Sequence, residues 1–333
     1  MSTAGPARPH HMPTNVVMPP MVTPLLPGGE ADTASTASLV RHFRQTGLDG
    51  VLMLGSSGEN ALIPLDQKLK VLEAGVAVRG DADEFHIMVG ITAMGPADAL
   101  VQARALSELR PDSLLLPAPV GFPFSPSELH DYYARVCDAT DVPVFAYEVP
   151  ARTHTTLGAA LLGRLADEGR IAGIKDSSGQ IGLTQQYTAL TKTRPGFVLY
   201  TGMEDAIDAA LLAGADGAIP GLANLFPEFH LALVRLARDG RWNEARAVQE
   251  RINTLLGIYF ADVTQASFSA AFFAIVKEAL VQRGIIEHAV VSAPFTPCAD
   301  QVRDHVARFL TLGSELLSEL GSLAELDNAG ATV

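Results

Sequence analysis

The stretch VFAYEVPARTHTTLGAALLGRLADEGRIAGIK, residues 144–175, decides the fold because it joins two short apolar runs through one longer, helix-like segment. The runs at 144–149 and 171–175 are rich in Val, Ile and other residues that favour strands. The segment between them, 157–166, has the length and composition of a helix. Strands that are apolar on both faces and alternate with helices predict a parallel sheet covered by helices.

The same alternation continues from residue 16 to residue 240. The predicted strands are Val16–Val22, Gly50–Leu54, His86–Val89, Ser113–Leu116, Val144–Val149, Ile171–Lys175, Val198–Thr201 and Gly217–Ile219. The predicted helices are Ser35–Thr46, Leu65–Arg79, Pro96–Leu109, Ser125–Ala139, Leu157–Ala166, Ile181–Thr193, Glu204–Ala213 and Pro227–Arg238. Eight such units predict a closed (β/α)8 barrel, a TIM barrel. The alternative, an open doubly wound sheet, is disfavoured because the chain lacks a G-x-G-x-x-G turn after its first strands.

Outside the barrel we expect two further regions. Residues 1–15 are rich in Pro, Gly and Ala and predict a flexible tail. Residues 241–333 carry only helical patterns, around Trp242–Phe260, Ser267–Arg283 and Ala299–Leu320, and predict a C-terminal helical extension.

Composition narrows the class of protein. The 333 residues are 48% hydrophobic, which is enough for a large core, and no run of eighteen apolar residues predicts a membrane span. A net charge of −13 disfavours binding to nucleic acid. The two cysteines, Cys137 and Cys298, are far apart, and the first residues lack the apolar core of a signal peptide, so we expect a cytoplasmic protein. His10 and His11 have no ligand partners nearby, and no metal is expected.

Lys175 is the most informative strand-end residue. Catalytic residues of such barrels lie where the strands end, and alternation places Lys175 on the same face as Gly173, whose missing side chain leaves space. Burial depresses the pKa of a lysine from about 10.4, and the neutral amine is a nucleophile that forms a Schiff base with a ketone. The alternative is a lysine that leaves the strand into solvent beside Asp176.

Tyr147 lies one βα unit before Lys175, so the two residues end neighbouring strands about 5 Å apart. A phenol there can shuttle the protons that Schiff-base formation and carbon–carbon cleavage require; the alternative is a packed, hydrogen-bonded tyrosine. The second strand ends in GSSGEN, residues 55–60, where Ser56, Ser57 and the adjacent N–H groups suit a carboxylate unless the segment is a plain turn. Glu59 is expected to brace this loop.

These motifs, GSSGEN, YEVPART and GIKDSSG, in this order and at these separations resemble the dihydrodipicolinate synthase and N-acetylneuraminate lyase family of pyruvate-dependent class I aldolases. The resemblance covers residues 16–310. It implies a (β/α)8 barrel with a C-terminal helical region, assembled as a homotetramer or dimer of dimers. It also implies that the reaction needs no cofactor, because the substrate forms a covalent imine with the protein.

The resemblance also assigns residues. It implies Lys175 as the Schiff-base former and Tyr147 as the proton relay. It implies that Ser56 and Ser57 hold the carboxylate of pyruvate, and that Gly202 and Ile219 line the same pocket.

Arg152 falls where the synthases keep an arginine for the carboxylate of the second substrate, which favours the synthase-like branch. The alternative for Arg152 is a pairing with a surface acid. Two positions depart from the family pattern. The segment LPAPVGFPFSP, residues 116–126, contains no relay tyrosine, and Phe122 cannot replace one, which puts dihydrodipicolinate synthesis itself in question. Glu148 replaces an asparagine; it either faces the pocket and changes its polarity, or faces outward and pairs with a basic neighbour.

The sequence therefore predicts a lyase that forms or cleaves a carbon–carbon bond between pyruvate and an aldehyde through a lysine imine. Three related activities stay open: a 2-keto-3-deoxy sugar acid aldolase, a dehydratase of such acids, and a 4-hydroxy-2-oxoglutarate aldolase. Two other classes of function are the alternatives to a lyase: a phosphate-binding barrel isomerase and a non-catalytic keto-acid sensor. The expected partners are small molecules, with neither nucleic acid nor membrane.

Overall fold

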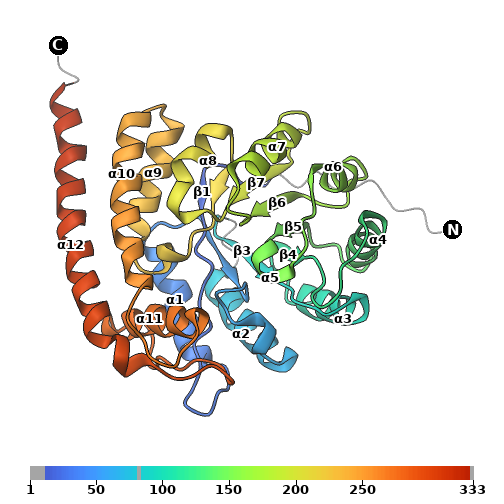
Figure 1. The fold of residues 1–333 in the computed structure, drawn as a ribbon, viewed down its shortest axis with the longest axis horizontal. Helices are drawn as coiled ribbons and strands as arrows, with labels where there is room; N and C mark the ends of the chain where they lie inside the picture. Colours follow the sequence, from blue (N-terminus) through green and yellow to red (C-terminus); the bar gives the residue numbers. More distant parts are fainter. Residues whose placement is uncertain (1–11, 81–83, 331–333) are drawn as a thin grey trace.

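The computed structural model describes residues 12–80 and 84–330, in which parallel strands form a barrel surrounded by helices (Figure 1). The strands are hydrogen-bonded in the order β1-β8-β7-β6-β5-β4-β3-β2, so neighbours in the sheet are neighbours in the chain. The bounds are β1 Val16–Val17, β2 Gly50–Met53, β3 His86–Gly90, β4 Ser113–Pro117, β5 Val144–Glu148, β6 Gly173–Asp176, β7 Val198–Thr201 and β8 Gly217–Ala218. The predicted (β/α)8 barrel is confirmed, and the open sheet is not formed.

The helices of the barrel follow the strands in alternation. Their bounds are α1 Thr33–Gln45, α2 Leu65–Arg79, α3 Pro96–Ser107, α4 Pro126–Cys137, α5 Pro150–Thr153, α6 Ala159–Asp167, α7 Ile181–Thr191, α8 Ile207–Ala213 and α9 Pro227–Arg238, with short 3-10 turns η1 Asn60–Leu62, η2 Glu204–Ala206 and η3 Gly221–Asn224. Helix α4 begins as its sequence predicts. Ser125 accepts a hydrogen bond from the N–H of Glu128, whose side chain accepts one in return from the N–H of Ser125, and Pro126 occupies the first helical position.

The first strand is shorter than predicted. Only Val16–Val17 pair with β8, whereas the sequence predicts a strand over Val16–Val22. Pro19 and Pro20 have no N–H to give to a ladder, so the segment bends away after two residues. The barrel closes through one isolated bridge between Pro20 and Leu52, supported by a 2.9 Å hydrogen bond from the N–H of Met21 to the carbonyl of Leu52.

Side chains inside the barrel form a layer of their own, beneath the mouth. Phe145 and Tyr200 stack with their ring centroids 5.4 Å apart. A Cβ built on Gly173 would lie 2.5 Å from the ring of Phe145, so only glycine leaves room for this stack. Lys175 and Tyr147 follow two residues further along their strands, and the packed aromatic layer therefore forms the floor of the site.

The C-terminal region consists of α10 Trp242–Leu255, η4 Leu256–Tyr259, α11 Phe268–Gln282 and α12 Ala299–Gly330. The long α12 runs along the outside of the molecule beside α10 (Figure 1). Helix α11 contacts the loops at the carboxyl ends of the strands through Lys277, which binds Glu59, and Ser269, which binds Arg152. Within the described residues no helix is both long enough and apolar enough to cross a membrane.

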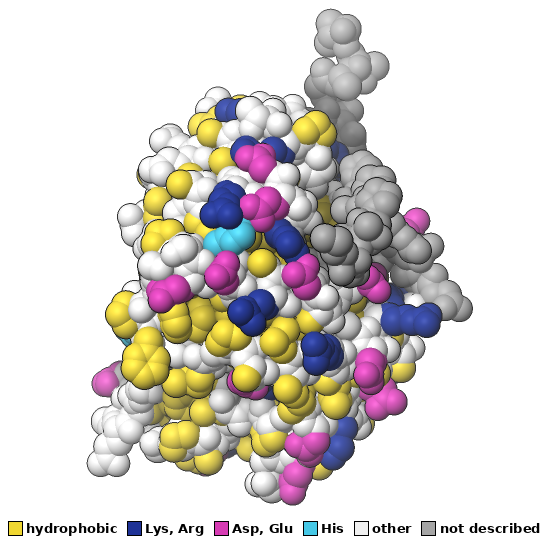
Figure 2. Space-filling view, turned by 90° about the vertical axis from the view of Figure 1, so that its right-hand side faces the viewer, with side chains coloured by type: hydrophobic (Ala, Val, Ile, Leu, Met, Phe, Trp, Pro, Cys, Tyr) yellow, Lys and Arg dark blue, Asp and Glu magenta, His cyan; other side chains and the backbone are white. Residues whose placement is uncertain are grey.

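Charged side chains of both signs are interspersed on the face shown in Figure 2. Ion pairs link neighbouring helices of the barrel, for example Arg194 of the α7 region with Asp167 of α6 at 2.8 Å. Exposed pairs of this kind stabilise a fold by less than about 1 kcal/mol each. This face carries no concentrated basic patch of the kind that binds nucleic acid.

Candidate active site

Lys175 and Tyr147 lie side by side at the carboxyl ends of β6 and β5. The two residues are direct partners in the parallel ladder. Both are buried, with 3% of Lys175 and 7% of Tyr147 exposed, and the Nζ atom lies 4.6 Å from the centroid of the Tyr147 ring. The alternative of a lysine that extends into solvent is therefore wrong.

The environment of Tyr147 favours loss of its proton. Burial by itself raises the pKa of a phenol, but the charge of Lys175 and hydrogen bonds from Ser177, Ser56 and Lys175 outweigh it. The pKa of Tyr147 is therefore lowered from its ordinary value of 10.0. A phenol with a lowered pKa gives up and takes back a proton more readily, which suits a relay.

Gly202, at the end of β7, leaves room for the amine. A Cβ at this position would lie 2.2 Å from Oγ of Ser177 and 3.3 Å from Cε of Lys175. Its N–H donates a 2.6 Å hydrogen bond to the carbonyl of Asp176, which fixes the end of β7 against the end of β6. Ile219 is buried in the barrel interior, with 1% exposed, and belongs to the same apolar layer as Tyr147.

The serine loop, residues 55–60, follows β2 and is held from two sides. Asn60 donates a 2.7 Å hydrogen bond to the carbonyl of Gly90 and a second one to that of Leu54, which joins the loop to β3. Glu59 adopts a left-handed backbone conformation with φ 56°. Its carboxylate accepts hydrogen bonds of 2.5 Å from Nζ of Lys277 in α11 and 2.6 Å from the N–H of Ser292. Glu59 therefore braces the loop, as the sequence predicts.

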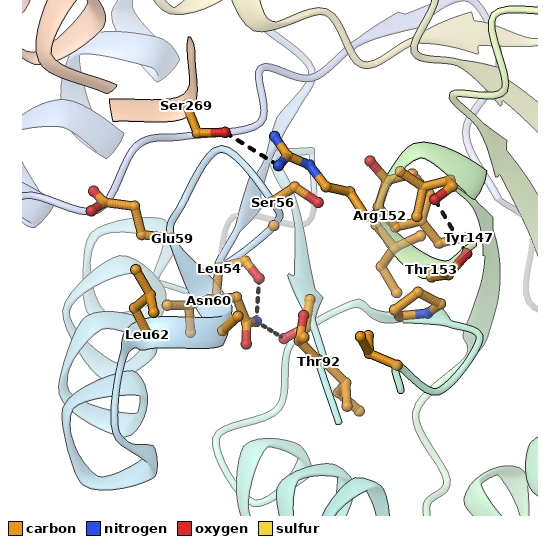
Figure 3. Close-up of a pocket in the computed structure, with 18 of the residues that line it drawn as sticks. Leu54, Ser56, Glu59, Asn60, Leu62, Thr92, Tyr147, Arg152, Thr153 and Ser269 are labelled. Atoms are coloured by element: carbon orange, nitrogen blue, oxygen red, sulfur yellow. Dashed lines mark hydrogen bonds between the residues drawn. The ribbon is translucent and has the colours of Figure 1, made fainter. Parts of the chain in front are cut away.

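A cavity of about 210 Å³ opens beside Tyr147, between the loops after β2, β3, β4 and β5 and the C-terminal region (Figure 3). Ser56, Tyr147 and Arg152 line it. Lys175, Ser57, Gly202 and Ile219 are not among its lining residues; Lys175 lies against the ring of Tyr147, which does line the cavity.

Arg152 lies in α5, a four-residue helix that the sequence analysis does not predict, where Pro150 takes the first helical position. Its guanidinium reaches across the edge of the cavity and donates a 3.2 Å hydrogen bond to Oγ of Ser269 in α11 (Figure 3). Within the described part of the chain no acid lies within ion-pair distance of Arg152, so the alternative of a surface ion pair is wrong. The guanidinium remains able to bind a carboxylate.

Glu148 neither faces the cavity nor pairs with a basic neighbour, the two roles expected from the sequence. It is fully buried and points outward from the barrel, where its carboxylate accepts hydrogen bonds from the hydroxyl of Tyr187 at 2.7 Å and the N–H of Leu157 at 2.9 Å. Burial raises the pKa of the Glu148 carboxyl despite these donors. The residue joins β5 to the helix layer and does not change the polarity of the cavity. Phe122 is 72% exposed.

Glu204 and Ser177 also belong to the site, although neither was predicted from the sequence. Glu204 follows β7, and its carboxylate accepts a 2.7 Å hydrogen bond from the N–H of Leu222 and a 3.4 Å one from the hydroxyl of Tyr259. Burial raises the pKa of Glu204, although these donors and the charge of Lys175 act to lower it. Both residues lie just after predicted strands. Because catalytic residues of such barrels lie at the strand ends, this location could have identified them as site residues.

The described residues contain no group of three or more His, Cys, Asp or Glu side chains placed to hold a metal ion. His10 and His11 lie outside the described residues, as does most of the expected tail at 1–15. The site therefore consists of an amine, a phenol, hydroxyls, a guanidinium and a carboxylate.

The fold and the site define a (β/α)8 barrel protein with a buried lysine–tyrosine pair at the carboxyl end of its strands. The model of the dihydrodipicolinate synthetase family matches residues 13–312, and the chain belongs to this family. The 4-hydroxy-tetrahydrodipicolinate synthase of Chlorobium limicola is 30% identical over 84% of this chain and 91% of its own length.

Solved structures have the same fold. A prophage protein of the dihydrodipicolinic acid synthase family from E. coli K12, in complex with pyruvate, has a TM-score of 0.81 at 24% identity and covers 90% of this chain and 98% of its own. A catalytic lysine mutant of the sialic acid aldolase of Ruminococcus gnavus has a TM-score of 0.80 at 19% identity, covering 90% and 96%. Synthases and aldolases are thus both similar to this chain, and their activities are those of lyases.

Proposed function

We propose that the protein is a class I aldolase that joins pyruvate to an aldehyde, or cleaves the product, through an imine on Lys175. The observation that carries the proposal is the buried pairing of the Lys175 amine with the Tyr147 phenol on neighbouring strands. A burial this complete is costly for a lysine without a function. The complex of a family member with pyruvate supports the choice of keto acid.

The proposed reaction begins when the neutral amine of Lys175 attacks the keto carbon of pyruvate. Tyr147 supplies a proton to the departing oxygen, which leaves as water, and the imine forms. The Tyr147 phenolate then removes a methyl proton, and the iminium accepts the electron pair of the broken C–H bond to give an enamine. The enamine carbon then attacks the aldehyde carbon, the aldehyde oxygen takes a proton from Tyr147, and water hydrolyses the imine to release a 4-hydroxy-2-oxo acid.

The remaining site residues have positioning roles in this proposal. Ser56 and Ser57, with the N–H groups of their loop, would hold the carboxylate of pyruvate. Gly202 keeps the space around the amine open, and Ile219 forms part of the apolar floor. The guanidinium of Arg152 at the cavity edge would provide a charged donor for the same carboxylate of the keto acid.

The proposal is tested by incubating the protein with pyruvate and borohydride, followed by peptide mass spectrometry. We expect one reduced pyruvyl adduct on Lys175 and none in Lys175→Ala. Lys68 is the matched control, because it is also buried and burial lowers the pKa of its amine to about 8. Lys68 lies between α2 and α3, where its Nζ donates a 3.0 Å hydrogen bond to Gln102. A phosphate-binding isomerase would give no adduct, and an adduct on Lys68 alone would overturn the proposal.

We also propose a cytoplasmic homotetramer or dimer of dimers. Cys137 and Cys298 are both free thiols, which suits a reducing compartment. Several large apolar side chains are exposed, among them Met94 at 65% and Phe122 at 72%, which suits burial in a subunit interface. Light scattering tests the assembly; a monomeric mass at micromolar concentration would contradict it.

A further inference from the structure

Most of the cavity surface beside Tyr147 is apolar. It extends from the ends of β2 and β3 to α11 and the segment that precedes α12. The apolar side chains that line it are Leu54, Ala61, Leu62, Ile91, Leu115, Pro117, Val120, Val149, Phe273 and Phe295. Phe273 and Phe295 pack against each other with ring centroids 5.3 Å apart, which forms one wall.

Three polar lining residues are already engaged with the protein itself. The carboxylate of Glu59 binds Lys277 and the N–H of Ser292, both buried. The side-chain amide of Asn60 donates to two backbone carbonyls. The hydroxyl of Thr153 donates to the carbonyls of Val149 and Thr155. Among these three side chains only the amide oxygen of Asn60 has no partner. A ligand that carries a chain of hydroxyl groups would therefore find one free acceptor here and no free carboxylate.

The polar groups that remain lie mostly at one edge. Figure 3 shows Ser56, Arg152 and Ser269 along this edge and Tyr147 at the end of the cavity, whereas Thr92 lies on the opposite side. A volume of about 210 Å³ is below the range of roughly 300–1,000 Å³ of sites for drug-sized ligands, so the occupant is small.

We propose that this cavity is the site of the second substrate and that it selects an aldehyde with an uncharged, apolar substituent of about the size of a benzene ring. The inference rests on the proposed aldolase function and adds the acceptor class to it. The aldehyde oxygen lies toward Tyr147, from which it receives a proton as the enamine carbon of pyruvate bonds to the aldehyde carbon. The substituent packs against the apolar wall.

Desolvation determines which aldehydes this cavity binds. A polyhydroxylated aldehyde entering this cavity exchanges water for apolar side chains, and each hydroxyl without a partner opposes binding. An apolar ring gains from the same exchange, because burial of a side chain the size of Phe contributes about 1.5–3 kcal/mol. The cavity therefore discriminates against sugar-derived aldehydes and favours apolar ones.

The experiment measures kcat/KM for benzaldehyde and for glyceraldehyde with saturating pyruvate, using the full chain. We expect benzaldehyde to be favoured at least about tenfold, in line with the burial of one ring. Leu62→Gln places an amide in the apolar wall at a half-buried position. It should lower kcat/KM for benzaldehyde about tenfold, mainly through KM, while the borohydride adduct with pyruvate forms at an unchanged rate.

The matched control is Val101→Gln, a similar change at an exposed position of α3 that does not line the cavity. It should leave both aldehydes unaffected. The possible results distinguish a wrong acceptor class from a wrong proposed function. Equal use of both aldehydes, or preference for glyceraldehyde, together with a normal adduct on Lys175 overturns the acceptor class alone. Absence of the adduct overturns the proposed function itself.

Discussion

Glu59 and Lys277 form a fully buried ion pair, Oε1 to Nζ 2.5 Å, between the serine loop after β2 and helix α11, 218 residues later in the chain. The carbonyl of Val290 accepts a second hydrogen bond from the same Nζ atom. The loop that is proposed to bind the keto acid thus takes its position from the C-terminal region. Without α11, the buried Glu59 carboxylate would lose its counter-charge and keep only the hydrogen bond from the N–H of Ser292.

Lys277→Met is therefore expected to destabilise the fold by about 3–5 kcal/mol, because it leaves a buried carboxylate unpaired. Urea unfolding measures the change. The double variant Glu59→Gln with Lys277→Met should lose less than the sum of the two single losses, since the unpaired charge is gone. Strictly additive losses would show that the two side chains do not interact.

Tyr147→Phe should reduce kcat for aldol cleavage by about 10²–10⁴, the usual contribution of a positioned proton donor. The borohydride adduct on Lys175 should still form, although more slowly. Tyr200→Phe is the matched control: Tyr200 pairs with Lys175 from the strand on its other side, but its hydroxyl donates a 2.6 Å hydrogen bond to the carbonyl of Pro13. Unchanged kcat in Tyr147→Phe would remove the phenol from the mechanism.

The pH dependence follows from the lowered pKa of Tyr147. Its phenolate should form at lower pH than that of an ordinary tyrosine, so the rate limited by proton donation should fall on the alkaline side below pH 10. Ultraviolet difference titration of wild type against Tyr147→Phe isolates this group. In Lys175→Met the positive charge is lost and burial dominates, so the pKa of Tyr147 should rise. A pKa that falls in this variant would contradict the assignment.

Gly202→Ala should slow imine formation by about 10²-fold, because the added Cβ displaces Ser177 or Lys175 from its position. The rate of adduct formation with pyruvate and borohydride measures this effect. Gly182→Ala in α7 serves as the control, since nothing lies within 4 Å of its added Cβ, and it should be neutral or slightly stabilising. Equal rates in the two variants would argue against crowding at the amine.

The strand–helix alternation and the strand-end positions of Lys175 and Tyr147 were predictable from sequence because both follow from local periodicity. The outward orientation of Glu148 was predictable in principle, since residues alternate between the two faces of a strand and Tyr147 faces inward. The short β1 follows from Pro19 and Pro20, whose missing N–H groups the strand prediction ignored.

Other features depend on contacts between distant segments. Nothing near Glu59 in sequence indicates Lys277, and nothing near Arg152 indicates Ser269, 117 residues away. The cavity wall likewise combines residues after β2, β3 and β4 with Phe273 and Phe295. Its apolar character results only when these segments pack together, so the proposed acceptor class could not be predicted from the motifs alone.

The closure of the barrel at Pro20 and Leu52 should affect how fast proteases degrade the protein. Only a single bridge and the hydrogen bonds beside it close the ring here, so we expect this junction to open more easily than the longer ladder between β2 and β3, and the serine loop begins three residues beyond Leu52. A keto acid attached to β6 and held by that loop would connect opposite sides of the ring and suppress opening by mass action. A high concentration of the keto acid would then slow degradation of the protein by proteases, in addition to supplying the substrate of the proposed reaction.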